Sequence, residues 1–114
     1  HQNIQNQLAI SLGENAEIEG QIKLKNKKSR FGDVVVRDND GKIIEVHQIG
    51  DMRSRGGFRP SARERGAIMD IREALGDKVR IVFHDKRQRV TLINPDKADD
   101  WKEPDKKHRK NSYS

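Results

Sequence analysis

The segment FGDVVVRDNDGKIIEVHQIG, residues 31–50, decides the fold, because it places two apolar stretches on either side of a turn signal. Residues 34–36 and 42–48 are rich in β-branched side chains, which favour strands. The intervening DNDG, residues 38–41, is typical of a hairpin loop in which a type I turn is followed by glycine in the left-handed conformation. The segment therefore predicts a β-hairpin whose alternate side chains point to opposite faces.

The hairpin loop sets a register for the two strands. In that register Asp33 faces His47, and Glu45 lies beside them on the same face, at spacings of about 5 Å. The other face would carry the apolar side chains of the hairpin core: Val34, Val36, Ile44 and Val46. Two carboxylates and an imidazole would thus meet at the open end of the hairpin. The alternative is an ordinary polar sheet face, and a shift of one residue in register would separate Asp33 from the other two.

Further elements flank the hairpin in the sequence. Apolar residues within 3–22 predict a helix that is clearest as far as Leu12. Residues 61–64, SARE, match a capping box, and Gly76 stands where a helix end favours the left-handed conformation, so a second helix is expected between them. Alternating apolar residues predict a strand at 79–83, and another is expected at 90–93. The order of helix, hairpin, helix, strand and strand predicts a small α/β or α+β domain.

The composition suits one domain and excludes several classes of function. The 114 residues include 24 Lys and Arg against 18 Asp and Glu, no Cys, and 32% hydrophobic residues. That length suits a single core, expected over residues 1–94, and the polar, charged segment 95–114 is expected to be a loosely ordered tail. The absence of Cys excludes disulfides, thiol catalysis and thiolate metal sites. No apolar run approaches the roughly 20 residues of a membrane span.

The formal net charge of +6 predicts a polyanionic or acidic partner. The cations are clustered, and one cluster is the candidate nucleic-acid surface: Arg53, Arg55, Arg59, Arg63 and Arg65. Arg63 and Arg65 fall in the first turn of the expected second helix. Positive charge in the first turn interacts unfavourably with the helix dipole. Contact with phosphate would explain why arginine occupies both positions. A solvated helix end, or a salt bridge to Glu64 or Asp70, is the structural alternative.

The acidic face of the hairpin indicates metal-dependent chemistry. Asp33 and Glu45 suit Mg²⁺ or another divalent metal, which takes one or two carboxylates and completes its shell with water and substrate phosphate oxygens. Such a metal activates water and neutralises charge on a scissile phosphate. His47 would orient or deprotonate the attacking water. Because Glu45 stands among apolar residues of a strand, it needs a partner or a shifted pKa.

The residues Phe31-Gly32-Asp33, followed by the hairpin and by Glu45-Val46-His47-Gln48, resemble the core of the PD-(D/E)XK nuclease superfamily. More narrowly, residues 30–75 are similar to nuclease toxin domains at the C-termini of bacterial polymorphic toxins. These include contact-dependent growth inhibition and Rhs-type effectors. The resemblance implies a small restriction-endonuclease-like mixed sheet, with a β-hairpin core flanked by helices.

The resemblance also implies roles residue by residue. Asp33 and Glu45 would be metal ligands, and His47 stands where the motif carries a lysine. Gln48 corresponds to a polar residue that some members use beside the motif. The further acid that the family commonly contributes from its first helix would be one of two residues: Glu17, the better placed, or Glu14.

The function implied by the resemblance is a metal-dependent nuclease toxin that hydrolyses phosphodiester bonds of DNA or RNA, including tRNA. The toxin would be a secreted or delivered bacterial effector that acts in the target-cell cytoplasm. A cognate immunity protein would neutralise it, and the basic surface predicts that this partner is acidic. Two alternatives stay open. One is a metal-independent ribonuclease with His47 and His84 as base and acid. The other is a nucleic-acid-binding module without catalytic activity, in which Asp33 and Glu45 are structural.

Overall fold

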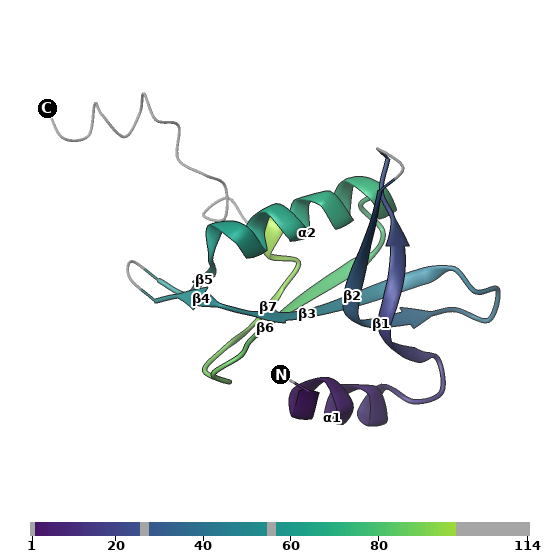
Figure 1. Ribbon diagram of the computed structural model, residues 1–114, viewed down its shortest axis with the longest axis horizontal. Coiled ribbons are helices and arrows are strands. Elements are labelled where there is room, and N and C mark those ends of the chain that lie inside the picture. The colour runs from purple at the N-terminus through teal and green to yellow at the C-terminus, as the bar shows by residue number, and fades with distance from the viewer. Residues whose placement is uncertain (1, 26–27, 55–56, 98–114) are drawn as a thin grey trace, which may run out of the picture.

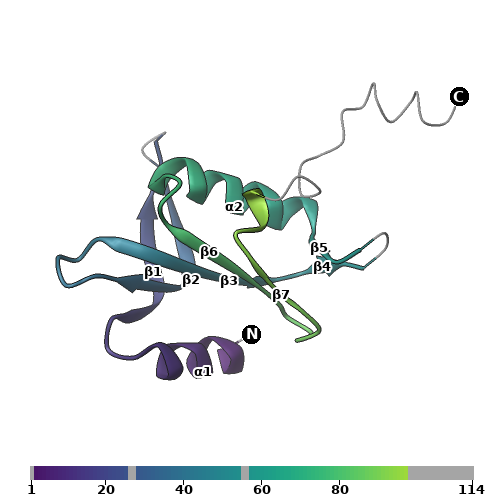
Figure 2. The same ribbon diagram turned by 180° about the vertical axis from the view of Figure 1, so that it is seen from behind.

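The computed structural model describes residues 2–25, 28–54 and 57–97, which form a mixed sheet with a helix on each face (Figures 1 and 2). In chain order the elements are α1 (Gln2–Leu12), β1 (Ala16–Lys23), β2 (Ser29–Arg37), β3 (Ile43–Gly50), β4 (Met52–Arg53), β5 (Arg59–Pro60), α2 (Ala62–Leu75), β6 (Arg80–Asp85), β7 (Thr91–Ile93) and the 3-10 turn η1 (Pro95–Lys97). The main sheet has the order β1-β2-β3-β6-β7; β3 and β6 run parallel and the other neighbours antiparallel. β4 and β5 form a separate two-stranded ribbon. The predicted α+β class is confirmed.

The hairpin loop between β2 and β3 forms as predicted. Gly41 has a φ of +84°, the left-handed conformation that the turn requires. The Asp38 carboxylate accepts hydrogen bonds from the amides of Asp40 and Lys42, each at 2.9 Å. These bonds add to the main-chain hydrogen bonds that the Asp38 amide donates to Lys42 at 2.8 Å and the Gly41 amide donates to Asp38 at 3.0 Å. Such side-chain bonds are typical of aspartate at the start of a turn.

A β-bulge follows the loop and changes the register of the hairpin. Arg37 faces Ile43, as the loop length predicts, but Val36 faces Glu45. Ile44 is therefore an extra residue in β3, and the strand beyond it is displaced by one position relative to the prediction.

The shifted register regroups the side chains of the hairpin. Val35 faces Val46 in the core beneath α2, whereas Val34 faces His47 on the opposite side of the sheet. The predicted common core face is wrong, because the bulge turns β3 over relative to β2. Asp33 lies on the same side as Val35, so the prediction that it shares a face with Glu45 and His47 is also wrong.

The main sheet is covered on both faces, which explains why residues 34–36 are apolar without alternation. Beneath α2 the core consists of Ile22, Val35, Val46, Ile68, Ile71, Val79, Ile81 and Phe83. On the other face α1 lies against β1 and β2 (Figures 1 and 2). There Gln5 donates a hydrogen bond to the main-chain carbonyl of Asp33 at 2.9 Å. Packing from both sides therefore fixes the part of β2 that carries Asp33.

The N-terminal helix is confirmed as far as Leu12, and the residues after it form the edge strand β1. β1 pairs antiparallel with β2 along its length. Helix followed by strand accounts for the mixture of helical and alternating apolar spacings over residues 3–22, which a single helix does not explain.

The helix α2 begins and ends where predicted, but its capping box does not form. Gly76 ends the helix with a φ of +88°. At the start, the hydroxyl of Ser61 makes no capping hydrogen bond. Glu64 accepts a hydrogen bond from the main-chain amide of Asp51 instead of reaching back to Ser61. The carboxylate of Glu64 is therefore turned toward the end of the sheet.

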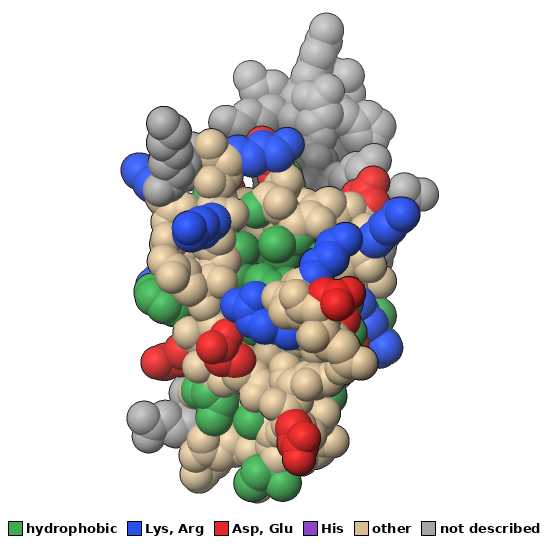
Figure 3. All heavy atoms as spheres, turned by 90° about the vertical axis from the view of Figure 1, so that its right-hand side faces the viewer, with side chains coloured by type: hydrophobic (Ala, Val, Ile, Leu, Met, Phe, Trp, Pro, Cys, Tyr) green, Lys and Arg blue, Asp and Glu red, His purple; other side chains and the backbone are tan. Residues whose placement is uncertain are grey.

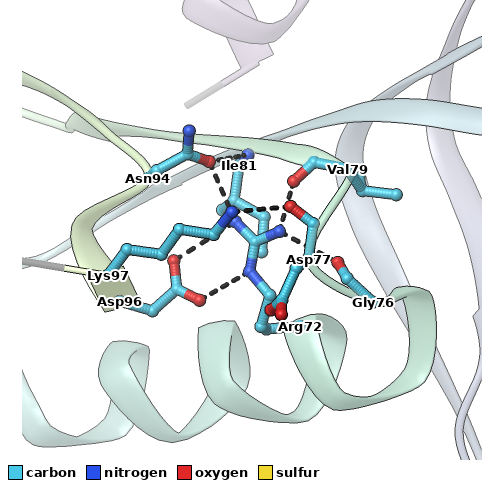
Figure 4. A network of polar contacts seen from close by, with 8 residues as sticks. All are labelled: Arg72, Gly76, Asp77, Val79, Ile81, Asn94, Asp96 and Lys97. Carbon is cyan, nitrogen blue, oxygen red and sulfur yellow. Dashed lines mark hydrogen bonds and ion pairs between the residues drawn. The ribbon is translucent and has the colours of Figure 1, made fainter.

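A buried arginine ties the end of the described chain to α2 (Figure 4). The Nε atom of Arg72 donates to Asp96 at 2.6 Å, and its Nη2 atom donates to the side-chain oxygen of Asn94 at 2.9 Å. Its Nη1 atom donates to the main-chain carbonyls of Gly76 and Val79. The side chains of Arg72 and Asp96 are only 10% and 6% exposed. This network holds η1 against α2; residues 98–114 of the predicted tail lie outside the described residues.

The end of the molecule at the β2–β3 turn carries charges of both signs around apolar side chains (Figure 3). A shallow pocket at this end is lined by Asp38, Lys42, Ile43, Ile44, Leu75, Gly76, Asp77, Lys78 and Val79. A pocket lined mainly by polar and charged side chains lies at the other end of β3. Within the described ranges, no helix is long and apolar enough to cross a membrane.

Candidate active site

Asp33 and Gln48 come together near the end of the β2–β3 pair, on the face that α2 covers. The main-chain amide of Asp33 donates to the side-chain oxygen of Gln48 at 2.8 Å. The Oδ2 atom of Asp33 accepts a hydrogen bond from the amide of Ile49 at 2.7 Å. The one-residue shift of the bulge produces this arrangement, because it brings Gln48 rather than His47 opposite Asp33. The sequence predicted both residues for the site, and the structure brings these two together.

A polar pocket of about 320 Å³ opens beside this pair. It lies where four segments meet: the first half of β2, the C-terminal end of β3, the first turns of α2 and the residue after β6. Its lining residues are Arg30, Asp33, Gln48, Ile49, Gly50, Asp51, Ser61, Arg63, Glu64, Ala67 and Lys86. Acids and bases are therefore both drawn from elements far apart in the sequence.

Glu64 supplies the second carboxylate near Asp33. Its side chain lies directly over Gly50, where an added Cβ atom would stand 1.4 Å from the Oε2 atom of Glu64. Only glycine at that position leaves room for the carboxylate. Burial raises the pKa of Glu64, and the negative charge of Asp33 raises it further. The Asp51 amide donates a hydrogen bond to the Glu64 carboxylate, which lowers the pKa of Glu64.

Burial also raises the pKa of Asp33, against the lowering effect of the hydrogen bond from Ile49. The charge of Glu19 adds to the increase. Glu19 interrupts β1 with a φ of +57°, at the position across the strands from Asp33. Acids that are desolvated beside other acids cluster at functional sites, since a bound cation relieves both penalties.

Three cations line the pocket around these acids. The Nζ atom of Lys86 lies 2.5 Å from an Asp51 oxygen, and this ion pair lowers the pKa of Asp51. Arg30 is anchored to Asp70 on α2 at 3.0 Å. Arg63 is exposed in the first turn of α2. The pocket thus combines an acidic floor with a basic surround.

Glu45 and His47 lie on the opposite face of the sheet and do not join Asp33. The Nε2 atom of His47 lies 2.6 Å from a Glu45 oxygen, and its Nδ1 atom lies 2.8 Å from the Nε2 atom of His84. Arg80 approaches Glu45 at 3.6 Å. Burial, and then the neighbouring His47, lower the pKa of His84 to about 4. The partner of Glu45 is therefore His47, which in turn contacts His84. The predicted metal-binding pair of Asp33 and Glu45 does not form.

The predicted helical acid does not reach the pocket either. Glu17 lies on the exposed edge strand β1 and pairs with Arg37 at 3.3 Å, and Glu14 is exposed in the turn after α1. The charge of Glu19, an exposed residue of β1, raises the pKa of Asp33, but Glu19 does not line the pocket either.

The predicted arginine cluster is divided among several places. Arg53 and Arg59 face each other across the β4–β5 ribbon. Arg63 lines the pocket, whereas Arg65 is buried in α2 with 7% of its surface exposed, so it is not a surface contact. Arg55 lies outside the described residues.

The pocket offers only a few protein oxygen atoms that could bind a hard divalent cation. Asp33 and Glu64 supply carboxylate oxygens, while the side-chain oxygen of Gln48 is already bonded to the Asp33 amide. In the part of the chain that the structure describes, no group of three His, Cys, Asp or Glu side chains gathers to hold a metal. Mg²⁺ is commonly held by one or two carboxylates plus water and substrate phosphate oxygens, so two acids meet its minimum.

The sequence did not predict Glu64 and Lys86 as members of the site. A signal for Glu64 was present, but its spacing from Ser61 favoured a capping box.

A scan against protein-family models found no match for the chain, and searches of curated proteins and of solved structures found no significant similarity.

Proposed function

We propose that this domain is a metal-dependent nuclease that hydrolyses phosphodiester bonds in the pocket formed by Asp33 and Glu64. One observation carries the proposal: two partly buried acids with raised pKa values share a polar pocket with Arg30, Arg63 and Lys86. The acids suit a cation and the bases suit an anion. A metal ion and the phosphate of a nucleic acid satisfy both halves of the pocket at once.

The chemistry of a bound divalent metal would be to activate water and to polarise the scissile phosphate. Asp33 and Glu64 are the side chains that would hold it. The Ile49 amide fixes one oxygen of Asp33, and Gln48 fixes the Asp33 main chain, so the carboxylate is oriented before any ligand binds.

The basic residues of the pocket act on the phosphate group. Arg63 is exposed and free to approach a phosphate oxygen, and Arg30 holds its guanidinium at the pocket through Asp70. Lys86, bonded to Asp51, keeps a positive charge at the pocket wall. Such fixed charges stabilise the negative charge that builds up on phosphate during hydrolysis.

This site modifies the roles that the PD-(D/E)XK resemblance implies. Asp33 keeps the role of a metal ligand, and the mixed sheet with a central hairpin and flanking helices agrees with the implied architecture. The second acid is Glu64 of α2 instead of Glu45 of β3. The positive charge that the motif supplies as lysine on β3 would come from Lys86, which follows β6.

The geometry favours this function over a metal-independent ribonuclease. In that alternative His47 and His84 act as base and acid on either side of a phosphate. Their nearest nitrogens lie 2.8 Å apart and contact each other, and His47 is only 5% exposed. A phosphate does not fit between two groups at hydrogen-bond distance.

The biological setting that we propose is a bacterial effector delivered into the cytoplasm of a target cell. Its partner would be an immunity protein whose acidic surface covers Arg63 and Lys86. The net charge of +6 supports such a partner, because opposite charges speed the capture of a toxin by its inhibitor.

Incubation of the purified protein with plasmid DNA and total tRNA, in Mg²⁺ and in EDTA, tests the proposed function. We expect cleavage in Mg²⁺, none in EDTA, and a loss of about 100-fold or more in Glu64→Gln. Glu73→Gln, an exposed acid on the same helix, is the matched control and should cleave like the wild type. Cleavage that survives EDTA would overturn the metal requirement. Nucleic-acid binding without cleavage in any condition would favour the non-catalytic binding module.

A further inference from the structure

The β4–β5 pair forms a short ribbon that projects beside the start of α2 (Figures 1 and 2). Met52 pairs with Pro60, and Arg53 pairs with Arg59. Directly opposed residues of an antiparallel pair point to the same face, so the two arginines lie side by side on one face of the ribbon. Arg53 is exposed and Arg59 is half-buried. We refer to residues 52–54 and 57–60 as the basic ribbon.

The basic ribbon is braced against the turn that joins β6 to β7. The Arg89 guanidinium lies 5.3 Å from the centre of the Phe58 ring, and its Nη2 atom donates to the Met52 carbonyl at 3.4 Å. The same guanidinium is held at 2.6 Å by Asp85, a fully buried carboxylate. A ribbon fixed in this way loses little conformational freedom when it binds a partner.

The ribbon starts and ends at the pocket of the proposed function. Gly50 and Asp51 precede it, Ser61 follows it, and all three line the pocket. Three residues of extended chain, from Met52 to Ser54, span about 10 Å. The major groove of B-form DNA is about 8.5 Å deep and about 12 Å wide, and it admits a two-stranded ribbon. A ribbon whose described residues Ser54 and Gly57 lie deep in the groove would therefore have its base, and the pocket, at the level of the phosphates.

We propose that the basic ribbon enters the major groove of duplex DNA, with Arg53 and Arg59 toward the DNA, and presents a backbone phosphate to the pocket. This inference rests on the proposed nuclease function and names its substrate class. A-form RNA does not offer an equivalent site, because its major groove is deep and too narrow for side chains to read. Single strands are bound chiefly by stacking on aromatic rings, and Phe58 of the ribbon is already covered on one side by Arg89.

Binding measured in EDTA separates this inference from cleavage. The probes are a DNA duplex of about 20 base pairs, an RNA duplex of the same sequence and the single DNA strand, each checked for integrity after the measurement. We expect the wild-type protein to bind the DNA duplex on the order of 10-fold more tightly than either other probe. Arg53→Ala/Arg59→Ala should lose about 10-fold or more in affinity for the DNA duplex, and its salt dependence should fall by about 1.8 in slope.

Lys42→Ala/Lys78→Ala removes the same charge at the opposite end of the molecule, where the surface is of mixed sign (Figure 3). We expect this control to lose less than about 3-fold, with an almost unchanged salt slope. Equal losses in the two double variants, or equal affinity for DNA and RNA duplexes, would overturn the ribbon proposal. Wild-type cleavage of duplex DNA by Arg53→Ala/Arg59→Ala would also overturn it and leave the nuclease site standing. A ribbon effect on binding without any cleavage would instead remove the proposed nuclease function.

Discussion

A single methyl group added at Gly50 tests the site without removing any of its chemical groups. In Gly50→Ala the new Cβ atom would stand 1.4 Å from Oε2 and 2.4 Å from Cδ of Glu64, so the carboxylate has to leave its position. Gly50 is not among the glycines with a positive φ, so the backbone accepts alanine. Because the displaced group is the end of a flexible side chain, the main loss of stability is the hydrogen bond from Asp51, worth about 0.5–1.5 kcal/mol.

The expected result is a folded protein with an impaired site. At pH 7 the melting temperature, measured by calorimetry, should change by only a few degrees, at about 4–8 °C per kcal/mol, because release of the ionised carboxylate from its buried position offsets the lost hydrogen bond. Cleavage in Mg²⁺ should fall by about 100-fold, since the second carboxylate no longer stands beside Asp33. With the carboxylate out of the pocket, the pKa of Glu64 should return toward its ordinary value, because burial and the charge of Asp33 no longer raise it.

Gly66→Ala is the matched control for this substitution. Gly66 lies in α2, and a Cβ atom added there meets nothing within 4 Å. Replacing a helical glycine by alanine should stabilise the protein by about 0.5–1 kcal/mol and leave cleavage unchanged. A Gly50→Ala protein that is folded and cleaves like the wild type would refute the position and role assigned to Glu64.

Three further predictions concern stability and pH. Arg72→Ala should lower the free energy of unfolding in urea by about 3–5 kcal/mol, because it leaves the buried Asp96 unpaired; a loss below about 1 kcal/mol would show that the network holds little. The pKa of His84 is depressed to about 4, so the unfolded chain binds the proton first and stability should fall as pH drops from about 6.5 toward 4; His84→Gln should flatten that part of the pH profile. The raised pKa of Glu64 disfavours folding when the carboxylate is ionised, and this cost is relieved as pH falls. Glu64→Gln should therefore melt at a higher temperature than the wild type at pH 7 while losing cleavage, and a lower melting temperature would contradict the desolvation of that carboxylate.

Local signals predicted the secondary structure well and the pairing of β2 with β3 poorly. The turn at Gly41 and the end of α2 at Gly76 have strong local causes, namely a positive φ that glycine adopts at little cost. The bulge at Ile44 has no such cause. Residues 34–36 are all apolar because both faces of the sheet are covered, so alternation did not reveal which face Asp33 occupies.

The composition of the site depends on contacts between distant segments. Asp33 and Gln48 were identified from the sequence, but Glu64 joins them only because α2 lies over Gly50. The spacing of Glu64 from Ser61 predicted a capping box, but the packing of α2 places the Glu64 carboxylate over Gly50 instead. His47 likewise found a partner, His84, through the parallel pairing of β3 with β6, which no local pattern encodes.

We propose Asp33 and Glu64, on the α2 face, as the catalytic carboxylates in place of the pair Asp33 and Glu45. The most direct measurement is the rate of plasmid cleavage in Mg²⁺ by Glu64→Gln and Glu45→Gln at equal protein concentration, each shown to be folded. We expect a loss of about 100-fold for Glu64→Gln and a rate within about 3-fold of the wild type for Glu45→Gln. The reverse order, an inactive Glu45→Gln beside an active Glu64→Gln, would contradict this proposal.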